Sequence, residues 1–263
     1  MLPYKQSLRG KISRRWAWSI ALTATIALSV AVFLIPAAAE TDSAPEESLL
    51  EIKPWIGDFD GMVERREIRA LVVYSKTFYF LDQGRQRGAS YELLKQFEKF
   101  INKKLKTKTL KFRVLFIPVG RDQLIPWLID GRGDIAVANL TITPQRQSQV
   151  DFSDPLISGV KELIVTGSSA PPVKSIADLA GKEIHVRRSS SYYESLTQLN
   201  ESFHQSGKPQ MKLVAADENF EDEDLLEMVN AGLIPMIVMD SHKAHFWKQI
   251  FDNIKVHPTI AVR

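Results

Sequence analysis

Hydrophobic and polar positions along the chain alternate in a repeating order that predicts strands and amphipathic helices in turn. Short apolar or alternating runs, typical of strands, cover residues 69–74, 111–117, 134–138, 163–166, 183–186, 211–215, 234–239 and 254–257. Apolar residues recur at helical spacing over residues 91–105, 122–129, 175–179, 191–203, 222–229 and 242–251. Because strands that alternate with helices favour parallel sheets, the pattern predicts an α/β fold. The alternation restarts after a break, so we expect two α/β units joined near residues 156–172.

The N-terminal residues 1–39 have the pattern of a targeting segment. Five basic side chains precede an apolar run at 16–35, and the sequence PAAA at 36–39 offers a small-residue cleavage site. The run is long for a signal peptide and long enough to span a bilayer, so a cleaved signal peptide and a retained membrane anchor both stay open. In either case the basic flank stays inside and the remaining chain is exported. We expect a periplasmic protein, soluble or tethered to the inner membrane only through residues 16–35, with residues 40–66 as a linker.

Composition narrows the classes of function. The 263 residues are 44% hydrophobic and 25% charged, which suits a globular protein with a substantial core, and there is no cysteine. Disulfides, thiolate catalysis and cysteine-based metal sites are therefore excluded. The chain has 34 basic and 31 acidic residues; five of the basic residues and none of the acidic ones fall in residues 1–39, which leaves 29 against 31 and a net charge of −2. The exported part thus gives no overall electrostatic reason to expect nucleic acid as a partner.

Residues 120–155 carry the most informative local pattern. The sequence predicts a helix, a tight turn, a buried strand and then an irregular loop with Thr141, Thr143 and Arg146. This order places hydroxyl groups and a fixed cation just past the carboxyl end of a strand, where open α/β sheets bind small ligands. Motifs of catalysis are missing: no H-E-x-x-H and no G-x-S-x-G occurs. His242 and His245 lie one helical turn apart without a third ligand nearby, so we expect no metal, cofactor or catalytic residue.

Several motifs, in order from about residue 66 to 257, resemble those of the family 3 solute-binding proteins. They are FYF at 78–80 with Asp82, Gly84, Gly88 and YEL at 91–93, DGRGD at 130–134, TITPQR at 141–146, DFSDP at 151–155, and SIADLAGK at 175–182. The resemblance implies a two-lobed, periplasmic-binding-protein-like α/β fold, with lobe 1 over residues 67–160 and lobe 2 over 161–263. It also implies a small amino-acid- or peptide-like ligand held between the lobes.

The first-lobe site residues follow from this resemblance. Arg146 would bind the α-carboxylate of the ligand, because a guanidinium grips a carboxylate through two parallel hydrogen bonds; the alternative is a surface arginine after a proline turn. Thr141 would add a hydroxyl, unless it only satisfies its own turn, and the carbonyl of Asn139 would accept from an ammonium. Phe78 would stack against the ligand, although aromatic residues more often belong to the core.

The second lobe supplies the remaining expected contacts. Ser190 and Ser191 lie where a helix begins, so they either cap it or help its free N–H groups attract a carboxylate. Asp240 ends a strand and would accept from a ligand ammonium; the alternative is an N-cap for the next helix. Arg187 and Arg188 favour an anionic ligand if they face the cleft, and otherwise form a solvated charge pair.

A narrower resemblance is to the membrane-bound lytic murein transglycosylase F family, in which such a binding module precedes a lysozyme-like catalytic domain. The residues SSSYYE at 189–194 and LLEMVNAG at 225–232 carry it. Glu194-Ser195 resembles the Glu-Ser pair of lytic transglycosylase active sites, but it falls within a predicted helix without the glycine-rich sequence that follows that pair. The sequence reaches residue 263, about where the family returns to lobe 1 with a final strand and helix, and holds no catalytic domain. We expect a module that exposes an apolar face and a sheet edge of lobe 1, with low stability or dimerisation as the result.

Two functions are consistent with these patterns. The first is an exported solute-binding module that serves a membrane transporter or regulates a cell-wall enzyme, with an amino acid, a small peptide or a muropeptide as ligand. The alternative is the non-catalytic N-terminal part of a peptidoglycan lytic transglycosylase.

Overall fold

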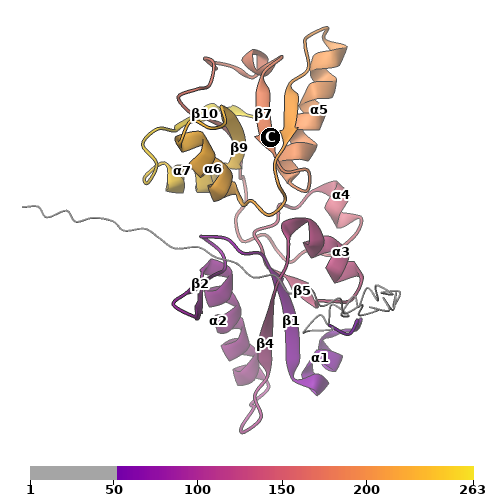
Figure 1. The fold of residues 1–263 in the computed structure, drawn as a ribbon. Coiled ribbons are helices and arrows are strands. Elements are labelled where there is room, and N and C mark those ends of the chain that lie inside the picture. The colour runs from indigo at the N-terminus through magenta and orange to yellow at the C-terminus, as the bar shows by residue number, and fades with distance from the viewer. Residues whose placement is uncertain (1–51) are drawn as a thin grey trace, which may run out of the picture. The chain divides into compact units, whose positions relative to one another are not determined.

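Residues 52–263 are organised around two larger β-sheets with helices packed on them, and a third sheet is a two-stranded hairpin (Figure 1). The computed structural model describes residues 52–263, which fall within one compact unit, Leu50–Arg263. The targeting segment and the first part of the expected linker lie outside the described residues. A three-stranded sheet forms lobe 1 and a five-stranded sheet forms lobe 2, which confirms the two-lobed α/β fold. No helix within residues 52–263 is long and apolar enough to cross a membrane.

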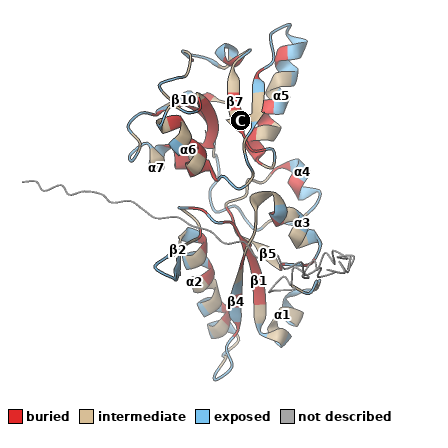
Figure 2. Cartoon of the chain, in the orientation of Figure 1, coloured by how far each residue is buried: buried red, intermediate tan, exposed pale blue. Residues whose placement is uncertain are grey.

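Lobe 1 is built on a parallel sheet with strand order β4-β1-β5. Its strands are β1 (Glu67–Val72), β4 (Arg113–Pro118) and β5 (Ile135–Ala136). Its helices are α1 (Phe59–Arg65), α2 (Ala89–Lys104), α3 (Leu124–Ile129) and α4 (Pro144–Gln147), with a 3₁₀ turn η1 (Arg121–Gln123) before α3. Alternate residues of β1 point to opposite faces: Ile68 and Val72 pack with α2, whereas Leu71, together with Val73 just after the strand, packs with Leu124 of α3. Both faces of this strand are therefore buried (Figure 2).

Lobe 2 contains a mixed sheet with strand order β10-β6-β9-β7-β8. Its strands are β6 (Glu162–Thr166), β7 (Glu183–Val186), β8 (Lys212–Ala215), β9 (Met236–Asp240) and β10 (Lys255–Ala261). Its helices are η2 (Ile176–Leu179), α5 (Ser191–Gln205), α6 (Asp222–Asn230) and α7 (Ser241–Trp247). Helix α5 packs against one face of the sheet through Leu196 and Phe203, and α6 and α7 cover the other face through Leu226 and Ala244.

Three short elements differ from the expected pattern. The hairpin of β2 (Phe80–Asp82) and β3 (Arg85–Arg87) was not predicted, because its strands have three residues each and are largely exposed. Its turn depends on Gln83 and Gly84, which both have positive φ angles, 50° and 77°. Helix α4 lies within the segment predicted as irregular loop. Thr143 caps it and Pro144 occupies its first turn, so four residues suffice to form it.

The last part of the expected linker, residues 40–66, contains helix α1, which packs on lobe 1. Met62 and Val63 join the core around β1, and the backbone N–H of Trp55 donates to the carbonyl of Gly131 over 2.8 Å. Ile52 packs against the α3 side of the sheet. Residues 52–66 therefore pack against lobe 1.

Candidate functional site

Polar residues at the carboxyl ends of strands from both lobes meet in one place. Arg121 follows β4, Asn139 follows β5, Arg187 follows β7, and Asp240 ends β9. Together with their neighbours they enclose a small cavity of about 20 Å³, room for about one water molecule. The cavity is lined by Arg121, Asn139, Leu140, Thr141, Arg146, Arg187, Ser190, Ser191, Tyr192, Asp222, Asp240 and Lys243. Six of the seven expected ligand-binding residues are thus brought together; Phe78 does not line the cavity.

Arg146 bridges the two lobes. Thr143 accepts a hydrogen bond from the backbone N–H of Arg146 over 3.3 Å and so fixes the start of α4. The guanidinium donates to the carbonyl of Thr141 over 3.2 Å and to the carbonyl of Ser189 over 2.9 Å, and its Nε lies 3.4 Å from Glu194. Burial lowers the pKa of Arg146, and the charge of Glu194 partly offsets this. Arg146 is therefore a buried cation of the cleft, and the alternative of a surface arginine is wrong.

Besides Arg146, six side chains of opposite formal charge lie together around the cavity. Glu221, the N-cap of α6, accepts from Arg121 Nε over 2.8 Å and from Arg187 Nη1 over 2.7 Å. Arg121 Nη2 also bonds to the second oxygen of Glu221, which makes that pair bidentate. Asp222 accepts from Arg187 and, over 2.7 Å, from Lys243. Three cations therefore face three carboxylates, Glu221, Asp222 and Asp240.

The pKa shifts show how strongly these charges depend on one another. Burial opposes ionisation of Asp222, but Lys243, Arg187 and Arg121 hold the pKa of its carboxyl far below the usual range. Burial also opposes the charge of Arg121, yet the bonds and charge of Glu221 raise the pKa of Arg121 above its ordinary value. Burial raises the pKa of Tyr192 well above the usual value, and Asp222 adds to this effect. The shifts therefore favour the charged forms of Asp222 and Arg121 and the neutral hydroxyl of Tyr192.

Asp240 is the least satisfied carboxylate of the cluster. Its Oδ2 lies 3.5 Å from the amide of Asn139 and 3.5 Å from Lys243 Nζ, both long contacts. Its Oδ1 is buried and has no hydrogen-bond partner within residues 52–263. Asp240 occupies the N-cap position of α7, but its side chain makes no capping hydrogen bond to that helix. A buried carboxylate oxygen without a partner is costly, and an ammonium group in the cavity would satisfy it.

The remaining expected residues have mixed outcomes. Ser190 is the N-cap of α5 and accepts from the backbone N–H of Tyr193 over 3.2 Å, while Ser191 is the first residue of the helix; both serines are buried. They therefore combine the capping role with a place at the cavity. Phe78 is half-buried, and Lys243 Nζ lies 5.5 Å from the centre of its ring. Arg187 is buried within the cluster, so it does not form a solvated pair with Arg188, which is exposed.

The acidic start of α6 also holds lobe 1. Ser75 Oγ donates to Glu223 over 2.5 Å, and Lys76 Nζ lies 2.6 Å from Glu227 and 2.9 Å from Asp224. Together with Arg121–Glu221, these contacts make α6 the main polar link from lobe 2 to lobe 1. Closure of the cleft is therefore supported by the protein's own charges.

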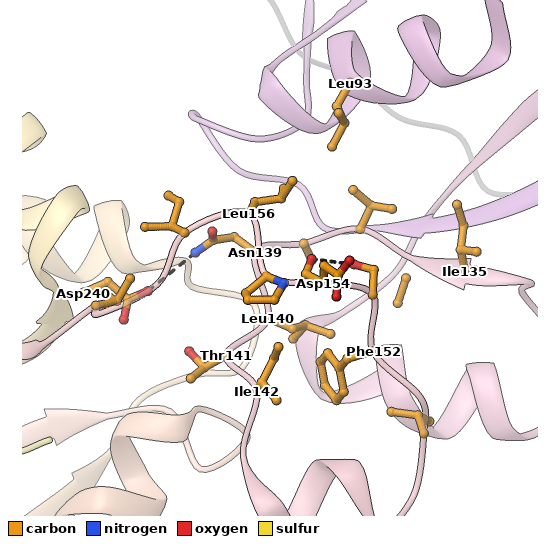
Figure 3. A pocket seen from close by; sticks show the side chains of 18 of the residues that line it. Leu93, Ile135, Asn139, Leu140, Thr141, Ile142, Phe152, Asp154, Leu156 and Asp240 are labelled. Atoms are coloured by element: carbon orange, nitrogen blue, oxygen red, sulfur yellow. Dashed lines mark hydrogen bonds between the residues drawn. The ribbon is translucent and has the colours of Figure 1, made fainter. Parts of the chain in front are cut away.

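A larger groove of about 770 Å³ adjoins the small cavity (Figure 3). Its walls are mostly apolar and come from α2, α3, the edge strand β5 and the segment around Phe152 and Leu156. Asn139, Leu140, Thr141 and Asp240 line both the groove and the small cavity. The volume lies in the range of ligand pockets, about 300–1,000 Å³. Among residues 52–263, β5 pairs only with β1, so the groove lies along an edge of the lobe 1 sheet.

The described residues offer no group of three or more histidine, aspartate or glutamate side chains placed to hold a metal ion. Burial lowers the pKa of His242, and neither of its ring nitrogens has a partner within residues 52–263, whereas His245 is exposed. Burial has the opposite effect on a carboxyl group, and it raises the pKa of Glu162, which pairs with Arg263.

Sequence reasoning missed Arg121, Tyr192, Glu221, Asp222 and Lys243, which form most of the charged cluster. For Arg121, its position in the sequence could have indicated a place at the cleft. Arg121 follows a predicted strand just as Asn139 does, so both belong at the same edge of the sheet. Glu221 and Asp222 gave no such signal, because acidic residues at the start of a helix are ordinary on a surface.

Comparison with known protein families gives one match that covers most of the chain. The sequence model of the bacterial extracellular solute-binding proteins, family 3, matches residues 72–244. This match confirms the resemblance drawn from the motifs.

Curated relatives narrow the comparison. The membrane-bound lytic murein transglycosylase F of Ectopseudomonas mendocina (strain ymp) is 32% identical over 191 residues, which are 72% of this chain and 36% of the relative. The protein of the same name from Shewanella halifaxensis (strain HAW-EB4) is 31% identical over 179 residues, 68% of this chain and 34% of the relative. The chain thus spans about a third of the length of these relatives.

Solved structures with similar folds include amino-acid-binding proteins. An ancestral arginine-binding protein bound to arginine has a TM-score of 0.55 and 28% identity over 73% of this chain and 78% of its own. An ancestral amino acid-binding protein, a precursor of cyclohexadienyl dehydratase, has a TM-score of 0.60 and 25% identity over 75% and 79%.

Proposed function

Because the chain belongs to the bacterial extracellular solute-binding proteins of family 3, we propose that it binds a small amino-acid- or peptide-like ligand between its lobes. The observation that carries this proposal is the convergence of Asn139, Thr141, Arg146, Ser190, Ser191 and Asp240 on one cavity. The unpartnered Oδ1 of Asp240 would accept from the ligand ammonium. Arg146 and the serines that begin α5 would bind its carboxylate.

The cavity holds about one water molecule, so the ligand enters only when the lobes move apart. Ligand binding then competes with the protein's own cross-lobe pairs, since Arg146 lies beside Glu194. The groove next to Asp240 leaves room for more than a free amino acid. A peptide or muropeptide with its amino group at Asp240 would extend along this groove.

A thermal-shift screen against amino acids, small peptides and muropeptides tests the proposal. A ligand that binds only the folded protein raises the melting temperature by mass action. We expect the shift at a fixed ligand concentration to be clearly smaller in Asp240→Asn and to persist in Asp252→Asn, which removes one charge from an exposed position. A shift that is equal in both variants would place the ligand elsewhere, and no shift from a cooperatively melting sample would count against binding of these classes.

We further propose that the module serves either a transporter or an associated cell-wall enzyme in the periplasm. The second candidate function is the non-catalytic N-terminal part of a peptidoglycan lytic transglycosylase. The curated relatives carry that name and are about three times as long as the matched part of this chain, which favours this candidate. The coding sequence beyond codon 263 distinguishes the two, because a lysozyme-like domain there would assign the module to an enzyme. On purified residues 1–263 we expect no release of muropeptides from peptidoglycan.

A further inference from the structure

The end of lobe 1 carries a dense cluster of positive charge. Between residues 99 and 113 there are seven basic side chains and no acidic one. All seven are exposed: Lys99, Lys103, Lys104, Lys106, Lys108, Lys111 and Arg113. None of them forms an ion pair with a carboxylate of residues 52–263. Asp58 and Asp60, at the start of nearby α1, are among the carboxylates that do not pair with them. We call these seven residues the basic end of lobe 1.

The loop that presents these cations is held in place by one half-buried amide side chain, Asn102. Asn102 Nδ2 donates to the carbonyl of Phe112 over 2.8 Å, and Asn102 Oδ1 accepts from the N–H of Phe112 over 2.9 Å. The hydroxyl of Thr107 also donates to Asn102 Oδ1, over 2.6 Å. Residues 105–112 therefore form a fixed loop between α2 and β4, and the charges are displayed on a preformed surface.

This loop lies at the end of lobe 1 farthest from the cleft. It joins the carboxyl end of α2 to the amino end of β4, whereas the ligand site is at the carboxyl ends of the strands (Figure 1). A partner at the basic end would therefore leave the cleft between the lobes free. At the tip, Leu110 is 63% exposed and stands between Lys108 and Lys111. An exposed leucine among lysines is suited to a partner with an anionic outer layer and an apolar layer beneath it.

We propose that the basic end of lobe 1 docks on a membrane surface rich in anionic phospholipid headgroups, with Leu110 entering the headgroup layer. Charge complementarity supports this partner, since each lysine near an anionic leaflet adds affinity. The apolar run at residues 16–35 is consistent with this partner, because a retained anchor would hold the exported chain next to a membrane face. The exposed leucine favours lipid over a purely polar polyanion. Docking here would hold the ligand cleft away from the membrane.

The absence of cysteine allows a direct test on the full chain. Thr109→Cys, labelled with an environment-sensitive fluorophore, reports on the loop. Gln198→Cys, labelled in the same way at an exposed position of α5 in lobe 2, is the control. Each is mixed with vesicles of phosphatidylcholine alone and of phosphatidylcholine with phosphatidylglycerol. Phosphatidylcholine alone gives the contribution of residues 16–35. We expect a blue shift at position 109 only with phosphatidylglycerol, and no shift at position 198.

Charge-matched variants complete the test. Lys106→Gln/Lys108→Gln/Lys111→Gln removes three cations from the basic end, and Lys174→Gln/Lys208→Gln/Lys255→Gln removes three exposed lysines of lobe 2. We expect the preference for phosphatidylglycerol vesicles to fall about a hundredfold in the first variant and little in the second. Equal losses in both variants would overturn the proposal, since they would reflect net charge alone. Binding of the basic end to nucleic acid or an anionic polysaccharide without a response to phosphatidylglycerol would overturn it as well.

Discussion

Neutralising Glu221 is the sharpest perturbation of the cleft. Its carboxylate is 3% exposed and bonds to Arg121 of lobe 1 and to Arg187 of lobe 2. Glu221→Gln keeps the shape of the side chain but leaves the cluster with three cations and two carboxylates. The amide also turns donors toward guanidinium groups that are themselves donors only.

The expected loss follows from the burial of this pair. Removing one partner of a buried ion pair costs about 3–5 kcal/mol, because the remaining charge stays desolvated. For a folded unit of this size, each kcal/mol lowers the melting temperature by about 2–4 °C, so Glu221→Gln should melt about 6–20 °C lower. Glu201→Gln, on an exposed face of α5, should change the free energy of unfolding by less than about 0.5 kcal/mol.

Urea unfolding of the single variants Arg121→Gln and Glu221→Gln and of the double variant measures the coupling. We expect the double variant to lose less than the sum of the single losses, because neither charge is then left unpaired. Glu221→Gln within about 0.5 kcal/mol of wild type, or strictly additive losses, would refute a buried cross-lobe ion pair.

Three further predictions concern other parts of the chain. Arg146→Ala should lower the free energy of unfolding by about 1–3 kcal/mol as well as abolish carboxylate binding, because two partly buried carbonyls lose their donor; an unchanged melt would count against this buried position of the arginine. Burial, assisted by the charge of Lys255, lowers the pKa of His257 below its ordinary value of 6.5, so the unfolded chain binds the proton more readily than the folded protein does. The free energy of unfolding should therefore fall as the pH drops from about 7 to 5. His257→Gln should reduce this pH dependence, measured by urea unfolding at each pH. Gly88→Ala should destabilise by more than about 1 kcal/mol, because φ is 113° and a Cβ would lie 2.3 Å from the carbonyl oxygen of Phe78; Gly159→Ala, with open space around it, should cost less.

Much of the fold is visible in the sequence because apolar periodicity reports burial directly. Strand β7 begins and ends as the pattern predicts, and α5 and α6 differ from it by two residues or fewer. Strand β5 is shorter than its apolar run, since only Ile135 and Ala136 pair with β1. Elements defined by caps and turns rather than by a buried face, such as α4 and the β2–β3 hairpin, leave no periodic signal.

The candidate site divides in the same way. Residues that follow predicted strands, such as Asn139 and Asp240, could be placed at the cleft, because parallel strands end at one edge of a sheet. Arg121 and Glu221 meet across the two lobes, 100 positions apart in the chain. No local pattern reveals that these two charges are buried together. Whether Asp240 or Arg146 contacts a ligand stays a prediction.

Calorimetric titration tests the central claim most directly. The ligand class with the largest thermal shift is titrated into wild type, Asp240→Asn and Asp252→Asn. We predict one-to-one binding that weakens about tenfold or more in Asp240→Asn, since a hydrogen bond to a charged group contributes about 1.5–3 kcal/mol, and no change in Asp252→Asn. Equal affinity in all three proteins would contradict a ligand site at the cavity between the lobes.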